Sequence, residues 1–175
     1  MHSFLIHLKD YINLMNYNDT LKSKDIGIFF WLLSLTILVI LIILVGGLTR
    51  LTDSGLSMVY WQPIMGTFPP LNNDAWIKIF NEYKNSPEFL IVNKSINLNE
   101  FKYIFWWEWS HRILARFIAL VLILPMLFFF LKRRISKKLF FHLFIVFLFI
   151  LFQAVVGWWM VKSGLNENPY VSPYR

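Results

Sequence analysis

Four ionisable side chains occur close together in the sequence, directly ahead of a long apolar run. Glu108, His111 and Arg112 belong to the stretch WWEWSHR, and Arg116 follows four residues later. On an α-helix, Glu108 shares a face with His111 at i+3 and with Arg112 at i+4. Ionisable side chains are costly inside a membrane-spanning helix and are usually retained there for a function. This stretch is therefore the first place to look for chemistry.

The residue types in this stretch suit a heme. A neutral imidazole is a ready ligand for iron, so His111 is a candidate axial ligand. Arginine clamps carboxylates in bidentate fashion, so Arg112 and Arg116 are candidates to hold heme propionates. A glutamate beside a ligand histidine can carry protons, which is the role considered for Glu108.

Simpler roles are open for the same residues. Arg112 and Arg116 could extend their long side chains to lipid headgroups. Glu108 could form an ordinary i, i+4 salt bridge with Arg112, and His111 could be a hydrogen-bonded interfacial residue. His142, which stands alone in the last apolar stretch, is interpreted as an interfacial or packing residue.

Three apolar stretches must position these side chains: residues 26–49, 117–131 and 139–161. The first two carry no charge, and apolar residues make up 57% of the 175-residue chain. A bilayer core requires about 20 helical residues. Helices that are apolar all round exclude a water-soluble three-helix domain. The sequence therefore predicts an all-α integral membrane protein with a bundle of three transmembrane helices.

The predicted organisation is a cytoplasmic tail (1–25), a first transmembrane helix (26–49), an outer loop (50–97), a second helix (98–131), a basic inner loop (132–138), a third transmembrane helix (139–161) and an outer segment (162–175). Asn97 and Glu100 predict a capping box at the start of the second helix, whose membrane part begins near residue 108. Apolar residues at helical spacing predict a short amphipathic helix near 74–84, lying on the outer membrane surface or roofing the bundle.

The charge distribution predicts the orientation in the membrane. Loop 132–138 has five basic residues and no acid, so the positive-inside rule places it and the N-terminus in the cytoplasm. The net charge of +7 concentrates there and is not a nucleic-acid signature. No arginine precedes Arg50, so a bacterial inner membrane is preferred to the mitochondrial one. The lack of cysteine excludes disulfides and thiolate metal sites.

Longer motifs around the charged stretch resemble the heme A synthase family. EWSHR resembles the family's Glu-x-x-His-Arg motif, and GGLTRLTDSGLSMVYWQPIMGTFPP looks like its signature after the first helix. NEFKYIFWWEWSHRILAR and GWWMVKSGL also match in order and spacing, so the similarity runs from about residue 27 to residue 175. The lack of cysteine resembles the alphaproteobacterial and mitochondrial branch of the family.

The resemblance implies an eight-helix enzyme, built from two similar four-helix halves, that oxidises the C8 methyl of heme O to the formyl group of heme A for cytochrome oxidase. It implies His111 as a heme iron ligand and Glu108 as the catalytic carboxylate, with Arg50, Arg112 and Arg116 as candidate propionate contacts. Heme O is then the substrate, and heme b is a cofactor bound mainly by the other half. Heme O synthase and an electron donor are the implied protein partners.

Only three of those eight helices are expected in this chain, because the fourth helix with the partner histidine and the whole second half are absent from it. The chain is therefore expected to be truncated, or to be one half of a split enzyme completed by a C-terminal half or a second copy. Two alternatives are a heme-binding or electron-transfer membrane subunit without methyl oxidation, and a purely structural anchor.

Overall fold

The computed structural model of the chain describes residues 2–59, 65–166 and 169. It contains α1 (His2–Leu51), a 3₁₀ turn (Met65–Thr67), α2 (Asn73–Lys84), α3 (Pro87–Ile91), α4 (Leu98–Leu131) and α5 (Lys137–Asn166). No strand occurs among these described residues. Helices α1, α4 and α5 are long and apolar enough to cross a membrane. The prediction of an all-α, multi-pass membrane protein is confirmed.

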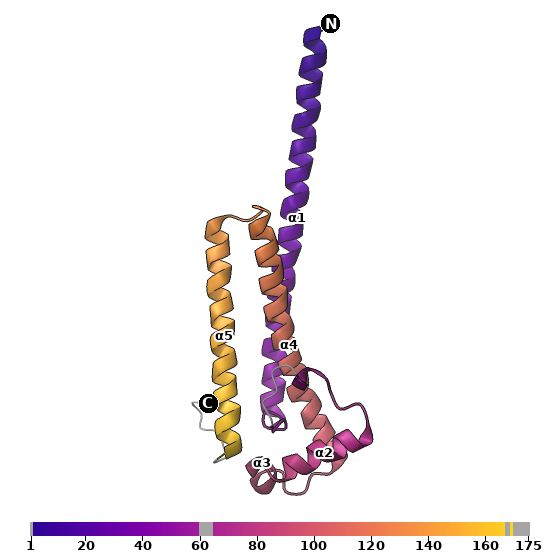
Figure 1. Cartoon of the computed structure of the whole chain (residues 1–175), viewed down its shortest axis with the longest axis vertical. Helices are drawn as coiled ribbons and strands as arrows, with labels where there is room; N and C mark the ends of the chain where they lie inside the picture. The colour runs from indigo at the N-terminus through magenta and orange to yellow at the C-terminus, as the bar shows by residue number, and fades with distance from the viewer. Residues whose placement is uncertain (1, 60–64, 167–168, 170–175) are drawn as a thin grey trace.

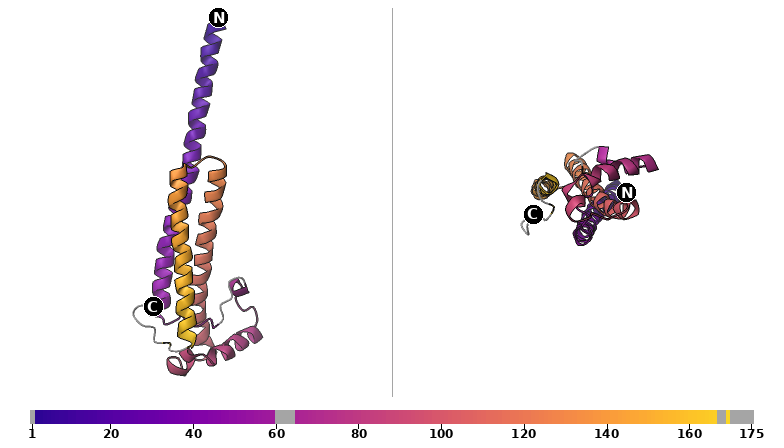
Figure 2. Two further views of the ribbon diagram at one scale, coloured as in Figure 1. Left: turned by 60° about the vertical axis from the view of Figure 1, so that its left-hand side comes forward. Right: turned by 90° about the horizontal axis from the view of Figure 1, so that it is seen from below.

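Helix α4 packs against both α1 and α5 and runs antiparallel to them (Figure 1). Helices α2 and α3, here together named the cap, lie across the end of the bundle where α1 stops and α4 starts. That end is here named the cap end. The turn between α4 and α5 marks the opposite end, here named the basic end. Figure 2 shows the same bundle from a second side and from below.

The helices extend beyond the apolar stretches from which they were predicted. α1 is helical from His2, although its candidate membrane span begins only at Ile26. α5 likewise runs from Lys137 to Asn166 rather than over 139–161. Polar helix ends are compatible with this, because they lie where water or headgroups can solvate them. Of the expected outer segment 162–175, residues 167–168 and 170–175 lie outside the described residues.

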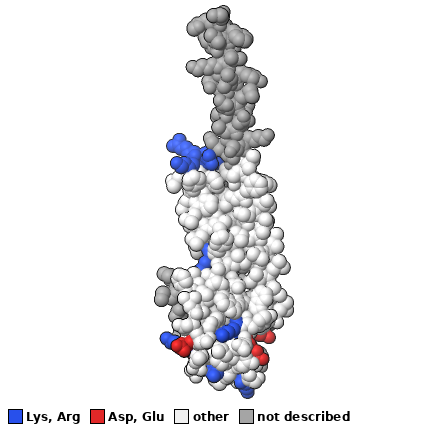
Figure 3. Space-filling model, turned by 90° about the vertical axis from the view of Figure 1, so that its right-hand side faces the viewer, with Lys and Arg blue, Asp and Glu red and all other residues white. Residues whose placement is uncertain are grey.

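On the face shown in Figure 3, charged side chains gather at the two ends of the bundle, and the belt between them is almost uncharged. The basic end carries Lys132, Arg133, Arg134, Lys137 and Lys138. Large apolar side chains cover the outside of the belt. Phe29, Leu124 and Phe152, one from each long helix, are all exposed. Such a surface is unfavourable in water and is expected in a lipid core.

A tryptophan of α1 compensates for the proline within α4. Pro125 has no N–H, so the carbonyl of Val121, four residues earlier, loses its helical donor. The Trp31 Nε1 donates a hydrogen bond to that carbonyl at 2.7 Å. The buried cluster around this contact consists of Trp31, Leu35, Leu122, Met126 and Ile135. The hydrogen bond therefore fixes where α1 lies along α4.

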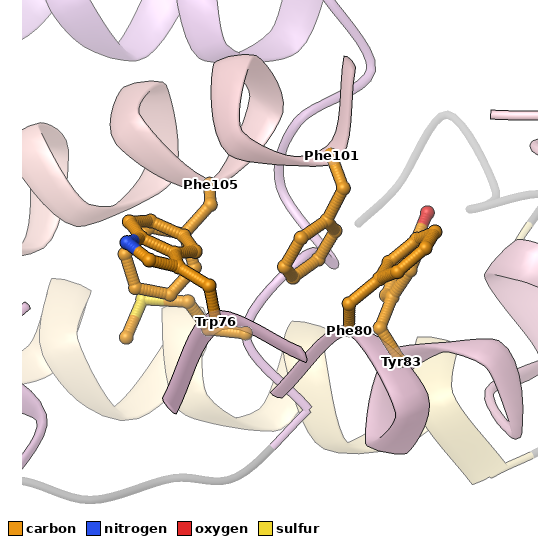
Figure 4. Packing of buried hydrophobic residues seen from close by; sticks show 6 residues of the cluster. Trp76, Phe80, Tyr83, Phe101 and Phe105 are labelled. Atoms are coloured by element: carbon orange, nitrogen blue, oxygen red, sulfur yellow. The ribbon is translucent and has the colours of Figure 1, made fainter. Parts of the chain in front are cut away.

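The apolar face of α2 packs against the first turns of α4 (Figure 4). The rings of Trp76 and Phe105 meet edge to face, with centroids 4.9 Å apart. Those of Tyr83 and Phe101 are also 4.9 Å apart. The apolar face of α2 is therefore covered by α4.

Side chains at the N-termini of α2 and α4 accept hydrogen bonds from the first amides of each helix. Asn72 precedes α2, and its side chain accepts a hydrogen bond from the Ala75 amide at 2.8 Å. The predicted capping box before α4 is present. Asn97 Oδ1 accepts from the Glu100 amide at 3.1 Å, and Glu100 Oε2 accepts from the Asn97 amide at 2.7 Å. These bonds satisfy amides that the first turn of a helix leaves unpaired.

Helix α3 buries a carboxyl group in the cap. The side chain of Glu88 is only 5% exposed. Burial, reinforced by the nearby carboxylates of Asp53 and Glu108, raises the pKa of Glu88 to about 7. Burial also raises the pKa of Tyr83 to about 12, against the opposing effect of the hydrogen bond from Asn93. The cap therefore excludes water from ionisable groups as well as from aromatic rings.

We expect Trp31→Phe to destabilise the protein by about 1–3 kcal/mol, because it leaves the Val121 carbonyl without a donor. The measurement is the unfolding free energy of the detergent-solubilised protein. The matched control is Trp159→Phe, which changes an exposed tryptophan of α5. Equal losses in the two variants would assign the effect to ring size rather than to the hydrogen bond.

We expect Glu88→Gln to stabilise the protein at pH 8 by at most about 3 kcal/mol. The pKa of Glu88 is about 7 in the folded protein, above its ordinary value of 4.5, so folding favours the neutral carboxyl. The contribution of the Glu88 carboxyl to the free energy of unfolding is therefore complete below pH 4.5 and is lost as the pH rises through 7.

The advantage of this variant should therefore disappear on titration towards pH 4.5, as followed by thermal unfolding. Asp74→Asn, which neutralises an exposed carboxylate on α2, is the control. A Glu88→Gln stability profile parallel to that of the unmodified protein across pH 5–8 would contradict the expectation.

Candidate functional site

The carboxylate of Glu108 joins α4 to the segment that follows α1. It is 2% exposed, and its Oε2 accepts hydrogen bonds from the Ser57 hydroxyl at 2.6 Å and the Met58 amide at 2.8 Å. Its Oε1 is ion-paired with Arg112, one turn further along α4. A buried carboxylate is tolerated when hydrogen bonds and a cation satisfy it in this way. The salt bridge considered from the sequence is therefore present, together with two further donors.

His111 lies where α4 meets α1. Its half-buried imidazole faces Gly46, where an ideal Cβ would stand 3.1 Å from Nε2. One turn along α1, the Thr49 hydroxyl donates to the Val45 carbonyl at 2.8 Å and reaches the Trp107 carbonyl at 3.4 Å. The two helices thus approach each other closely at the turn that carries the histidine.

The three candidate arginines occupy different environments. The side chain of Arg112 is 11% exposed and pairs with Glu108. Arg116 is half-buried one turn deeper in α4, whereas Arg50 is exposed in the last turn of α1. The structure groups Arg112 and Arg116 on α4 with Glu108 and His111. Arg50 lies on α1 instead.

A buried donor in the same part of α4 has no acceptor among the described residues. The Trp109 Nε1 is buried without a hydrogen-bond partner among the described residues. Its ring packs edge to face on Trp106, with centroids 5.2 Å apart. Buried donors in native proteins are nearly always paired, so this N–H is suited to an acceptor that is not part of the described chain.

His142 lies away from this group, in the second turn of α5 at the basic end. It is exposed, and its Nδ1 is 2.6 Å from the carbonyl oxygen of Lys138, one turn earlier. A ring nitrogen so close to a carbonyl acts as the donor. The position agrees with the interfacial role considered from the sequence.

Sequence reasoning missed the residues that hold the candidate site in place. Ser57 and the Met58 amide bind Glu108, and Gly46 and Thr49 lie against the turn of His111. Each of them is about 50 residues or more from its partner along the chain. The Gly46-Gly47 pair is the one signal that could have indicated a close approach of two helices.

Comparison with known proteins places the chain in a family. Residues 29–175 match the family of cytochrome oxidase assembly proteins designated COX15-CtaA. The heme A synthase of Parvibaculum lavamentivorans is 47% identical over 94% of this chain and 48% of its own length. That of Nitrosospira multiformis is 47% identical over 87% of this chain and 42% of its own length. No solved structure matches the chain.

The chain spans less than half the length of these relatives. The heme A synthase of Bradyrhizobium diazoefficiens, 48% identical over 83% of this chain, is matched over 40% of its own length. The family match nevertheless covers all of α4, including Glu108 and His111. It also covers the candidate membrane spans of α4 and α5 and nearly all of that of α1. The chain therefore belongs to the COX15-CtaA family of cytochrome oxidase assembly proteins.

Proposed function

We propose that the chain is part of a heme A synthase, which oxidises the C8 methyl of heme O to the formyl group of heme A for cytochrome oxidase. One observation carries the proposal: Glu108 and His111 lie on one face of α4, with Glu108 buried under a network of donors. The relatives named heme A synthase support it, since they are 47–48% identical to this chain.

The described residues fit a heme. No three His, Asp or Glu side chains group as metal ligands in the described part of the chain. A single imidazole suits a metal that brings its remaining equatorial ligands with it, as iron does in a porphyrin. The cationic side chains of Arg112 and Arg116 suit a ligand that carries acceptor oxygens, as does the Trp109 N–H, which has no partner among the described residues.

Each residue then has a defined role. His111 holds the heme iron, and Arg112 and Arg116 bind propionates on the same side of α4, with Arg50 as a less supported candidate. When bound, the heme supplies the iron chemistry on which the methyl oxidation depends. The remaining contribution of this chain is to orient the heme, to exclude water with the cap, and to accept protons.

Glu108 is the proton acceptor in this proposal, and Oε1 is the atom that accepts. A carboxylate has about four lone-pair sites. Ser57 and Met58 occupy those of Oε2, and Arg112 takes one on Oε1. In the proposed reaction, two hydroxylations of the methyl leave a diol, and the diol loses water to give the formyl group. That loss of water moves a proton from one hydroxyl to the departing one, and the lone pair of Oε1 that no described donor takes can accept this proton and return it.

The proposed setting is the bacterial inner membrane, with the basic end in the cytoplasm and the cap end outside. The cluster of five basic residues at the basic end supports this orientation. The candidate site then lies near the outer face. The rest of the protein, or a second copy, supplies the partner histidine and the heme b site of the proposed eight-helix architecture. Heme O synthase and an electron donor are the proposed partners.

A second candidate function is a heme-binding or electron-transfer subunit without methyl oxidation. The network around Glu108 favours it. With three donors, the carboxylate can serve simply as a structural link between α4 and the segment after α1, and it then needs no catalytic role. The identity of the heme that the protein produces separates the two functions.

We expect His111→Ala to abolish the heme absorption that depends on this half of the protein, because the variant lacks the imidazole that would hold the iron. The measurement is the ratio of heme to protein after purification of the full-length protein from its own membranes. His142→Ala is the matched control, since that side chain is exposed at the basic end. An unchanged heme ratio in His111→Ala would favour the purely structural anchor.

We expect Glu108→Gln to lower heme A formation by about 10²-fold or more, because the amide cannot accept a proton. Hemes extracted from the membranes are identified by mass and absorption, and heme content should persist. Glu100→Gln is the control on the same helix, since glutamine is also compatible with a capping box. Heme A formation at the ordinary rate in Glu108→Gln would remove the catalytic role and leave the binding subunit.

A further inference from the structure

Gly46 brings the backbone of α1 unusually close to the imidazole of His111. A Cβ built on Gly46 would stand 3.1 Å from Nε2 and 3.4 Å from Cδ2. Carbon atoms in favourable contact are about 3.5–4.0 Å apart, so a methyl group at this position would crowd the ring. At the next residue, Gly47, the same construction meets no described atom within 4 Å.

The crowding cannot be relieved easily by moving the helices apart. The Thr49 hydroxyl, one turn from Gly46, reaches the Trp107 carbonyl at 3.4 Å. In an α-helix that carbonyl also accepts the amide of His111, four residues on. Towards the basic end, the hydrogen bond from Trp31 to the Val121 carbonyl holds the same pair of helices. The ring of His111 is therefore the part that would have to move.

The atoms that a Gly46 side chain would meet identify what the glycine is for. Small residues at helix crossings commonly allow backbone to approach backbone. Here the nearest atoms are Nε2 and Cδ2 of His111, which form the coordinating edge of an imidazole. The missing side chain thus lets this edge of the imidazole lie directly against the backbone of α1.

We propose that Gly46 is a positioning residue for the heme ligand His111: the missing side chain lets the imidazole lie directly against α1 and so fixes the orientation of the ring. This inference rests on the proposed function, in which His111 would hold the heme iron. A methyl group at residue 46 would turn the imidazole away from the orientation in which it binds. Residues that orient a metal ligand typically affect metal affinity by about 10–100-fold.

The test compares Gly46→Ala with Gly47→Ala in the full-length protein purified from its own membranes. The readouts are the rate at which heme transfers to excess apomyoglobin and the electron paramagnetic resonance signal of the ferric heme. We expect Gly46→Ala to speed heme transfer by about tenfold or more and to shift the signal. Gly47→Ala should match the unmodified protein in both readouts.

A double variant separates the imidazole from general packing. If Gly46 acts through His111, adding Gly46→Ala to His111→Ala should change nothing further, because the crowded ring is gone. The double variant is also informative if Gly46→Ala alone prevents the protein from accumulating. In that case the double variant should accumulate to the same level as His111→Ala. A double variant worse than His111→Ala would assign Gly46 to helix packing and overturn the inference.

The two proposals fail in distinguishable ways. If His111→Ala retains its heme with an unchanged signal, the assignment of the axial ligand fails, and the inference about Gly46 fails with it. If His111→Ala loses heme but Gly46→Ala behaves as Gly47→Ala does, only the positioning role is lost.

Discussion

Glu108 is buried at the junction of the apolar belt and the cap, and the groups around its carboxylate are arranged to donate to it. The Ser57 hydroxyl and the Met58 amide come from the segment after α1, and Arg112 comes from the next turn of α4. An ionised carboxylate without such partners is strongly unfavourable in a nonpolar surrounding. The cap end can therefore close only when this segment is folded against α4.

The same contact orders the cap around it. Met58, whose amide binds Glu108, places its side chain in the buried cluster with Trp76, Phe105 and other aromatic residues. The electrostatic network and the aromatic packing thus share a residue, and each positions the other. A change at Glu108 is consequently felt in the fold as well as in the proposed chemistry, and this is why a conservative glutamine is more informative there than alanine.

Local features of the fold were predictable from the sequence, because they depend on residues a few positions apart. The capping box of Asn97 and Glu100 and the pairing of Glu108 with Arg112 are interactions within one or two turns of a helix. The three apolar helices follow from length and composition alone.

Contacts between helices were not predictable in this way. Trp31 and Val121 are 90 residues apart, and the membrane part of α1 is apolar on all sides, so its periodicity does not indicate which face meets α4. The proximity of Gly46 to His111 was not predictable for the same reason. The site was therefore predictable as a set of side chains on α4, but its walls, which α1 and the following segment provide, were not.

The compensation of Pro125 by Trp31 also bears on how the protein enters the membrane. A chain is synthesised from its N-terminus, so α1 is available in the bilayer before α4 arrives. When α4 inserts, the Val121 carbonyl, which has no donor within its own helix, meets an indole N–H that is already in the bilayer. The carbonyl therefore spends little time in the lipid core without a hydrogen bond. The order of the helices along the gene is thus also the order in which donor and acceptor become available during biogenesis.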